Sequence, residues 1–198
     1  MGRRSRLPAV LAVVLLALSL AGCGINNIPT MDEGVKAAWG QVQNQYQRRA
    51  DLIPNLVNTV KGYAEHERET LSAVTEARAK VGQMRLGADV IDNPEALRTF
   101  ERNQGQLSSA LSRLMVVAER YPDLKANQNF LSLQAQLEGT ENRIAVARRD
   151  FVQAVQTYNT EIRTFPGLIW HAILHGDMEV RESFQAAEGA DVAPTVEF

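Results

Sequence analysis

Two histidines near the C-terminal end of the chain come closest to a reactive site in residue type and spacing. His171 and His175 are four residues apart, and Glu179 follows four residues later. On a helix this spacing brings two imidazoles and one carboxylate to one face, a ligand set that zinc accepts. The order differs from the His-Glu-x-x-His arrangement of zinc proteases, and Gly176 interrupts the segment. A metal-binding or enzymatic bundle using His171 and His175 is therefore the alternative hypothesis, and we predict no metal, cofactor or catalytic residue.

The other candidates for catalysis form no constellation. His66 has Tyr63 three positions before it, so the Glu-x-x-His motif of carboxylate-bridged di-iron bundles is missing. The acid-rich run at residues 65–69 is typical of a solvated helix face with pairs of opposite charge. No serine has a partnering histidine and aspartate, and the sequence lacks a glycine-rich phosphate-binding loop. We predict that the protein is not an enzyme.

The N-terminal residues have the composition of a targeting segment. A basic start precedes an apolar stretch at residues 7–20, which is shorter than the roughly 20 apolar residues of a transmembrane helix. Small residues then precede Cys23, the only cysteine in the chain. This order resembles a bacterial lipobox, where cleavage occurs before the cysteine and its sulfur receives diacylglycerol. We predict a signal peptide at 1–22 and lipid attachment, including palmitate, at Cys23; the alternative is an uncleaved N-terminal anchor that ends at Cys23.

Charge and cysteine content limit the partners. Three of the 21 basic residues and none of the 23 acidic ones lie in residues 1–22, so the mature chain has 18 against 23 and a net charge of −5. The mature sequence has no run of basic residues that could bind along a phosphate backbone, so we predict no nucleic-acid partner. A single cysteine also excludes an intramolecular disulfide. The expected partners are the lipid membrane and an unknown envelope protein. Gly24 is not the aspartate that retains lipoproteins in the inner membrane of enteric bacteria, so the outer membrane is favoured if the host is Gram-negative.

A long core helix is predicted at residues 124–165. Large apolar side chains recur every seven residues there, which is typical of a coiled-coil seam and not of a strand. The residues on this stripe are Phe130, Leu137, Ile144, Phe151, Tyr158 and Phe165. Such a helix needs other helices to cover its apolar stripe in water.

Three further helices are predicted at residues 32–50, 52–84 and 94–121. The first has an apolar stripe with helical spacing, formed by Val35, Ala38, Trp39, Val42, Tyr46 and Arg49. We expect the chain to fold back at residues 51–54, where Pro54 would interrupt a continuous helix. The alternative is a single kinked helix over residues 32–84, whose exposed ends would pack in a homo-oligomer. Asn93 and Pro94 form a strong start signal for the third helix.

These elements predict an all-α fold, an elongated up-and-down four-helix bundle at residues 32–165. A lipidated tether at residues 23–31 precedes the bundle. Residues 166–198 form a C-terminal appendage, partly disordered at residues 185–198. Within this appendage, residues 168–174 are expected to form a short helix that lies against the bundle or the membrane interface.

Three charged residues fall at or beside the predicted apolar seams. Glu141 and Arg148 lie seven residues apart beside the stripe of the long helix, and Glu67 lies in the seam of the second helix. If they face inward they must be paired, because an unpaired buried charge costs several kcal/mol. We predict a polar layer that fixes the helix register; a ligand-binding polar pocket is the alternative.

Several sequence blocks resemble the LemA family of bacterial envelope proteins. The blocks are RRADLIPNLV at 48–57, TVKGYA at 59–64, YPDLKAN at 121–127 and EGTENRI at 138–144. The resemblance covers about residues 30–170 and implies a membrane-tethered helical bundle that faces outward from the cytoplasm. It implies no activity, because the family has no agreed biochemical function. The chain departs from many members in its lipobox-like Cys23, and the match thins out near residues 171–175. We predict a noncatalytic scaffold or protein-interaction lipoprotein; an envelope ligand sensor is a further alternative.

Overall fold

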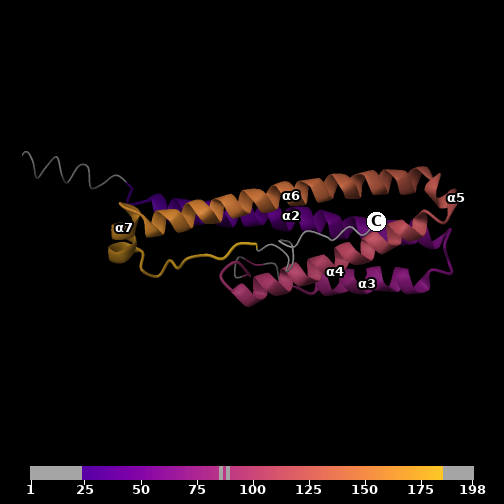
Figure 1. The fold of residues 1–198 in the computed structure, drawn as a ribbon, viewed down its shortest axis with the longest axis horizontal. Helices are drawn as coiled ribbons and strands as arrows, with labels where there is room; N and C mark the ends of the chain where they lie inside the picture. The colour runs from indigo at the N-terminus through magenta and orange to yellow at the C-terminus, as the bar shows by residue number, and fades with distance from the viewer. Residues whose placement is uncertain (1–23, 85–86, 88–89, 185–198) are drawn as a thin grey trace, which may run out of the picture. The chain divides into compact units, whose positions relative to one another are not determined.

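The computed structural model describes residues 24–84, 87 and 90–184, and within them it contains helices and no strand (Figure 1). The helices are α2 (Asn27–Lys61), α3 (Arg68–Gly82), α4 (Pro94–Ala118), α5 (Pro122–Lys125), α6 (Gln128–Arg163) and α7 (Gly167–Leu174). The predicted all-α class is confirmed. The signal peptide at 1–22, the lipid attachment at Cys23 and the predicted disorder at 185–198 fall outside the described residues.

The described chain divides into two compact units. The larger unit consists of residues 36–153 and 181–184, and the smaller unit of residues 24–35 and 154–180. Helices α2 and α6 contribute residues to both units. Each unit is described by itself below.

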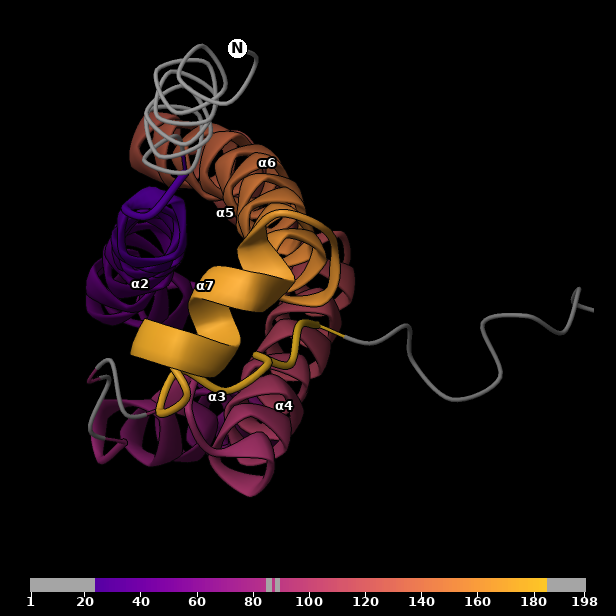
Figure 2. The same cartoon turned by 90° about the vertical axis from the view of Figure 1, so that its left-hand side faces the viewer.

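The larger unit is an up-and-down bundle. Figures 1 and 2 show that α2, α3, α4 and α6 reverse direction in succession, with α5 in the connection between α4 and α6. Two hydrophobic clusters form its interior. The first is aliphatic, with Ile53, Leu56, Val60, Val74, Leu107, Leu114 and Leu137 among its buried members. The second is aromatic, and its rings belong to Trp39, Tyr46, Phe100, Phe151 and Phe184. The predicted four-helix bundle is therefore confirmed.

The turn between the first two bundle helices lies later than predicted. Helix α2 continues through Pro54 and ends at Lys61, so both the break at residues 51–54 and the single kinked helix over 32–84 are wrong. Pro54 has no N–H, which removes the intrahelical partner of the Ala50 carbonyl. The guanidinium of Arg78 on α3 replaces that partner, because its Nε donates to the Ala50 oxygen at 3.0 Å. The proline is thereby accommodated inside the helix.

Two local expectations also need correction. The predicted tether at residues 23–31 is helical from Asn27 onward, and Pro29 stands in the first turn, where its missing N–H breaks no helical bond. At the other end, Phe165 lies beyond the last residue of α6 and is 81% exposed, so it has left the apolar stripe. The other five residues on that stripe are buried, as predicted.

The smaller unit packs the start of α2 against the end of α6. Its buried side chains include Ile28, Val35, Val155, Tyr158 and Ile162. The chain then turns tightly into α7. A Cβ on Gly167 would lie 2.1 Å from the carbonyl oxygen of Glu161, so only glycine permits this approach of the two backbones. The result is that α7 starts directly beside the last turn of α6.

Candidate functional site

A buried arginine lies at the centre of the larger unit. Arg49 belongs to the same stripe of α2 as Tyr46 and Ile53, and its side chain is only 1% exposed. One guanidinium nitrogen, Nη1, donates to the Glu141 carboxylate of α6 and to the Ser108 hydroxyl of α4, each at 2.9 Å. Charge-assisted hydrogen bonds of this kind are about twice as strong as neutral ones. Arg49 therefore joins three helices.

The second terminal nitrogen of Arg49, Nη2, is directed at α4. It donates to the side-chain oxygen of Gln104, which is itself buried, and lies 3.4 Å from the Gln104 backbone oxygen. Within the part of the chain that the structure describes, Arg49 Nε and Gln104 Nε2 are buried without a hydrogen-bond partner. An unsatisfied buried donor costs about 1–3 kcal/mol. Both terminal nitrogens of the guanidinium are hydrogen-bonded, whereas its Nε is not.

These polar residues form one layer between the two hydrophobic clusters. On α2 the aromatic cluster precedes Arg49 and the aliphatic cluster follows it; on α4 the same order surrounds Gln104. On α6, which runs in the opposite direction, Glu141 stands between Leu137 and Phe151. A slip of α2 or α6 by one turn would separate Arg49 from the Glu141 carboxylate, and a slip of α4 would separate it from Gln104 and Ser108. The geometry is that of the predicted register-fixing layer.

A second charged cluster surrounds Arg148. Its Nη2 donates to the Glu101 carboxylate of α4 at 3.0 Å, and its Nη1 donates to the Tyr46 hydroxyl at 3.2 Å. The guanidinium also lies over the Phe184 ring, 3.9 Å from the centroid, a favourable cation–π arrangement. Both charged residues predicted on α6 are therefore paired, each with a different helix. Neither presents a free charge for catalysis.

Glu67 does not lie in an apolar seam. It is the residue before α3 and is half-buried, because the chain turns there and does not continue as a helix. The Tyr121 hydroxyl donates to its carboxylate at 3.1 Å. Burial raises the pKa of the Tyr121 phenol, and the hydrogen bond to Glu67 raises this pKa further because it requires the proton. The pair links the α2–α3 turn to the end of α4.

The histidines are not brought together as metal ligands. His171 Nε2 lies 2.9 Å from the Met178 carbonyl oxygen, and His175 Nε2 lies 3.1 Å from that of Ile25. Since a carbonyl only accepts, each Nε2 carries a proton and is not a ligand in this arrangement. His66 is exposed. Among the described residues, no group of three or more His, Cys, Asp or Glu side chains has the proximity that a metal ion needs.

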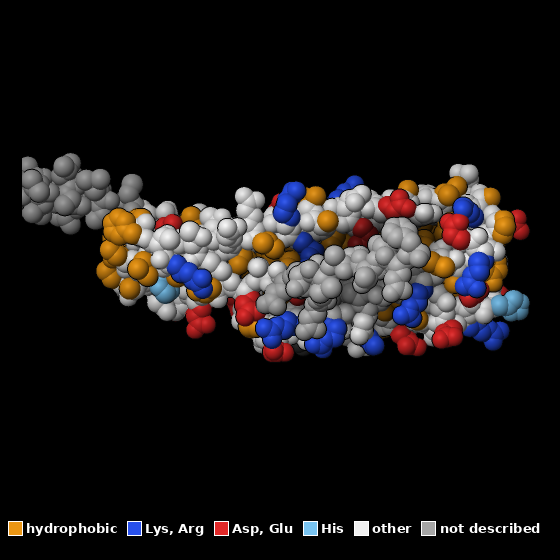
Figure 3. Space-filling view, viewed as in Figure 1, with side chains coloured by type: hydrophobic (Ala, Val, Ile, Leu, Met, Phe, Trp, Pro, Cys, Tyr) orange, Lys and Arg blue, Asp and Glu red, His pale blue; other side chains and the backbone are white. Residues whose placement is uncertain are grey.

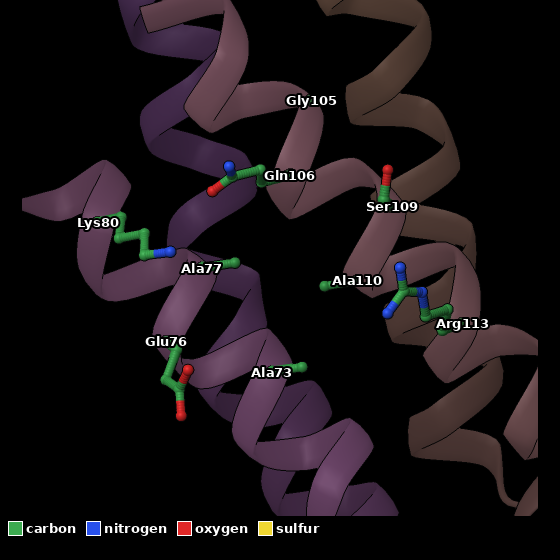
Figure 4. Close-up of a pocket in the computed structure, with 9 residues that line it drawn as sticks. All are labelled: Ala73, Glu76, Ala77, Lys80, Gly105, Gln106, Ser109, Ala110 and Arg113. Carbon is green, nitrogen blue, oxygen red and sulfur yellow. The ribbon is translucent and has the colours of Figure 1, made fainter. Parts of the chain in front are cut away.

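A shallow groove of about 520 Å³ runs between α3 and α4 (Figure 4). Small residues line it on both helices, and charged and amide side chains stand at its edges. The lining residues are Ala73, Glu76, Ala77, Lys80, Gly105, Gln106, Ser109, Ala110 and Arg113. Ser109 has no histidine beside it in the groove. This surface can accept a polar chain or a helix, but it holds no nucleophile with a base.

Sequence reasoning overlooked the two central members of the polar layer. Arg49 lies on the apolar stripe of the first predicted helix, and Gln104 lies seven residues from both Leu97 and Leu111, so the sequence contains both signals. A long polar side chain at a position otherwise occupied by apolar residues indicates a buried polar contact. The sequence did not say which helix would supply the partner, because that depends on the register of three helices.

The fold and the polar layer define an antiparallel helical-bundle protein with an internal charge network. The LemA family model matches residues 38–198, and the chain belongs to the LemA family. Among the described residues, no helix combines the length and the apolar composition that crossing a membrane requires.

Curated relatives come from magnetotactic bacteria and from a mycoplasma. The chain is 28% identical over 174 residues to magnetosome protein MamQ 2 of Paramagnetospirillum magneticum, which covers 80% of this chain and 64% of the relative. It is 26% identical over 131 residues to protein LemA of Metamycoplasma hominis, covering 66% and 56% of the two chains. It is 25% identical over 186 residues to MamQ of Magnetospirillum gryphiswaldense, covering 83% and 68%. The chain thus spans less than two thirds of the length of the first two relatives.

Proposed function

We propose that this LemA-family protein is a noncatalytic, lipid-anchored scaffold of the bacterial cell envelope that binds a partner protein through its helical surface. The observation that carries the proposal is that the convergent charged side chains bond to each other. Arg49 is engaged with Glu141, and Arg148 with Glu101, so these groups hold helices together. A bundle whose internal charges are paired with each other acts through its outer faces.

Further support comes from the relatives and the N-terminal sequence. Two of the relatives reported above are named as magnetosome proteins. The basic, apolar and small residues before Cys23 resemble a lipoprotein signal, which supports a bundle outside the cytoplasm and, in a Gram-negative host, favours the outer membrane. The negative charge of the mature chain argues against nucleic acid as the partner.

Cross-linking in intact cells tests the scaffold. A second shallow groove, between α2 and α6 in the larger unit, includes Val146 in its lining. A photo-reactive residue is introduced at Gln106 in the α3–α4 groove, at Val146, or at the control position Val116, which lines neither groove. We expect a discrete envelope protein to be captured from one groove position and not from Val116. Equal capture from all three positions, or no protein product from any, would contradict the proposal.

A further inference from the structure

We propose that the exposed apolar face of α7 lies against the surface of a lipid bilayer. The helix has the sequence GLIWHAIL and contains no charged residue. Large apolar side chains are exposed on it and at its start, among them Ile173 at 67%. The full set is Phe165, Leu168, Ile169, Ile173 and Leu174. Figure 3 shows hydrophobic side chains gathered over α7.

The path of the chain identifies the surface that covers this face. Gly24 lies beside the turn into α7, where a Cβ on Gly24 would stand 3.8 Å from Pro166 Cγ. The next residue, Ile25, accepts a hydrogen bond from His175 at the other end of α7. Gly24 has φ +103°, a conformation that glycine adopts readily and that turns the chain at this point. The first described residues therefore lie beside the start of α7 and are hydrogen-bonded to its end.

The lipid attached to Cys23 would enter the bilayer next to α7. Cys23 is the residue bonded to Gly24, and consecutive Cα atoms are about 3.8 Å apart, so a lipid on Cys23 would be attached one residue from the described chain. The inference rests on the anchor of the proposed function at this one point. Gly24 and Ile25 lie beside α7, so an acyl chain attached to the residue before them would bring the apolar side chains of α7 to the level of the lipid headgroups.

The chemistry of α7 suits an interface and not the bilayer interior. Leucine and isoleucine supply apolar area, and Trp170 is a residue that membrane interfaces favour. The two histidines keep polar nitrogens on the helix, bonded to backbone carbonyls of the same unit. A short apolar helix with these features lies in the plane of the interface. A second attachment beside the lipid would fix the orientation of the smaller unit on the membrane.

Tryptophan quenching in vesicles tests this contact. The chain has two tryptophans, and Trp39 is buried in the larger unit. The full chain, purified from bacterial membranes in detergent, is reconstituted into phosphatidylcholine–phosphatidylglycerol vesicles with or without phospholipids brominated near the headgroup. We expect brominated lipid to cause a loss of emission in the wild type and no loss in Trp170→Phe, where Trp39 reports alone. Equal quenching in the two proteins would overturn the inference.

A pair of substitutions tests the apolar face itself. Ile173 and Val116 are exposed to nearly the same extent, 67% and 66%, and neither belongs to the buried core. Ile173→Asp places a charge on α7, whereas Val116→Asp places the same charge on α4. We expect the quenching by brominated lipid to be lost in Ile173→Asp and retained in Val116→Asp. Unchanged quenching in Ile173→Asp would contradict contact through this face.

Flotation of the same vesicles separates this inference from the anchor. Protein that floats with the vesicles but is not quenched keeps the anchor and overturns the α7 contact, leaving the face to a protein partner. A Cys23→Ser chain that floats and is quenched keeps the α7 contact and removes the need for the lipid. Wild-type protein that neither floats nor is quenched overturns both the anchor and the α7 contact.

Discussion

The buried pair of Arg49 and Glu141 is asymmetric. Arg49 is 1% exposed, whereas Glu141 is 42% exposed and retains contact with water. Removing the carboxylate leaves a buried cation without a counter-charge, while removing the guanidinium leaves a carboxylate that water can solvate. The two halves of the pair therefore differ in what their loss costs.

We expect Glu141→Gln to destabilise the bundle by about 3 kcal/mol, since it leaves the buried Arg49 charge without its carboxylate. Arg49→Met should cost less, about 1–2 kcal/mol, through lost hydrogen bonds to Gln104 and Ser108. The double variant should be no less stable than Arg49→Met alone. Urea unfolding followed by circular dichroism measures the free energy of unfolding of each protein.

The neighbouring residue provides the control for this comparison. Arg48 is exposed on the same helix, and Arg48→Met should change the free energy of unfolding by no more than about 0.5 kcal/mol. If Arg48→Met and Arg49→Met cost the same, the polar layer would have no special role. Wild-type stability in Glu141→Gln together with a lost cellular phenotype would instead favour a ligand pocket.

The Tyr121 phenol should titrate above its ordinary pKa of about 10, because burial and the hydrogen bond to Glu67 both favour the protonated form. Ultraviolet absorbance against pH, compared with Tyr121→Phe, isolates this group. Glu67→Gln should lower the pKa of Tyr121 toward the ordinary value, whereas Glu65→Gln at an exposed position should not. A Tyr121 pKa that is the same in both variants would contradict the assignment.

The sign of the effect on stability follows from the raised pKa. The phenol must keep its proton to donate to Glu67. The contribution of the pair is therefore fully present below the unfolded pKa near 10 and is lost as the pH rises through the higher folded pKa. The difference in stability between wild type and Tyr121→Phe should shrink over that alkaline range.

At the scale of elements, α2 depends on a hydrogen bond from another helix. A proline in a helix interior costs about 3 kcal/mol, part of which is the lost bond to the carbonyl four residues before it. Arg78 supplies a donor to that carbonyl of Ala50. The continuity of α2 through Pro54 is thus supported by α3, a contribution that helix propensity does not include.

A double-mutant cycle between Pro54 and Arg78 tests this dependence. Arg78→Ala should cost about 1.5–3 kcal/mol in the wild type, because a charged donor is lost from the Ala50 carbonyl, to which Pro54 cannot donate. In a Pro54→Ala background the new N–H restores the helical bond, and the cost of Arg78→Ala should fall to about 0.5 kcal/mol. Lys80→Ala, on the same helix, should cost the same in both backgrounds. Additive effects of the first two substitutions would exclude the coupling.

The periodic positions were predictable from the sequence, and the helix ends were less so. The heptad stripe located five buried residues of α6, because a seven-residue period requires no knowledge of the partner. The end of α2 was mislocated, since local rules treat Pro54 as a break and cannot foresee a guanidinium from a later helix. Phe165 was mislocated because the stripe was extended past the point where the helix ends.

The candidate site was likewise predictable only in part. Glu141 and Arg148 were expected to be paired, but their partners Arg49 and Glu101 come from other helices and emerge only once those helices are in register. The spacing of His171 and His175 suggested convergence. In the structure each imidazole bonds to a different carbonyl: His171 to that of Met178, where the chain turns after α7, and His175 to that of Ile25, before α2.

For the whole molecule, the anchor predicts the cellular location. Cys23→Ser should abolish the incorporation of labelled palmitate and move the protein from the membrane fraction, provided that cleavage and acylation require this thiol. Asn26→Ser, three residues later, should behave as the wild type. Cell fractionation with immunodetection measures both. A Cys23→Ser chain that still incorporates labelled lipid would remove the lipobox argument.

The distance along the chain between Arg49 and Glu141 has a consequence for how the protein is made. The two residues are 92 positions apart, so the pair closes only after almost the whole bundle has been synthesised. Bringing such remote segments together carries an entropic cost that precedes any gain from the contact. Until α6 emerges, Arg49 lacks its Glu141 partner, and a cation without that partner favours hydration. We expect the nascent chain to keep this surface in water until α6 has been made.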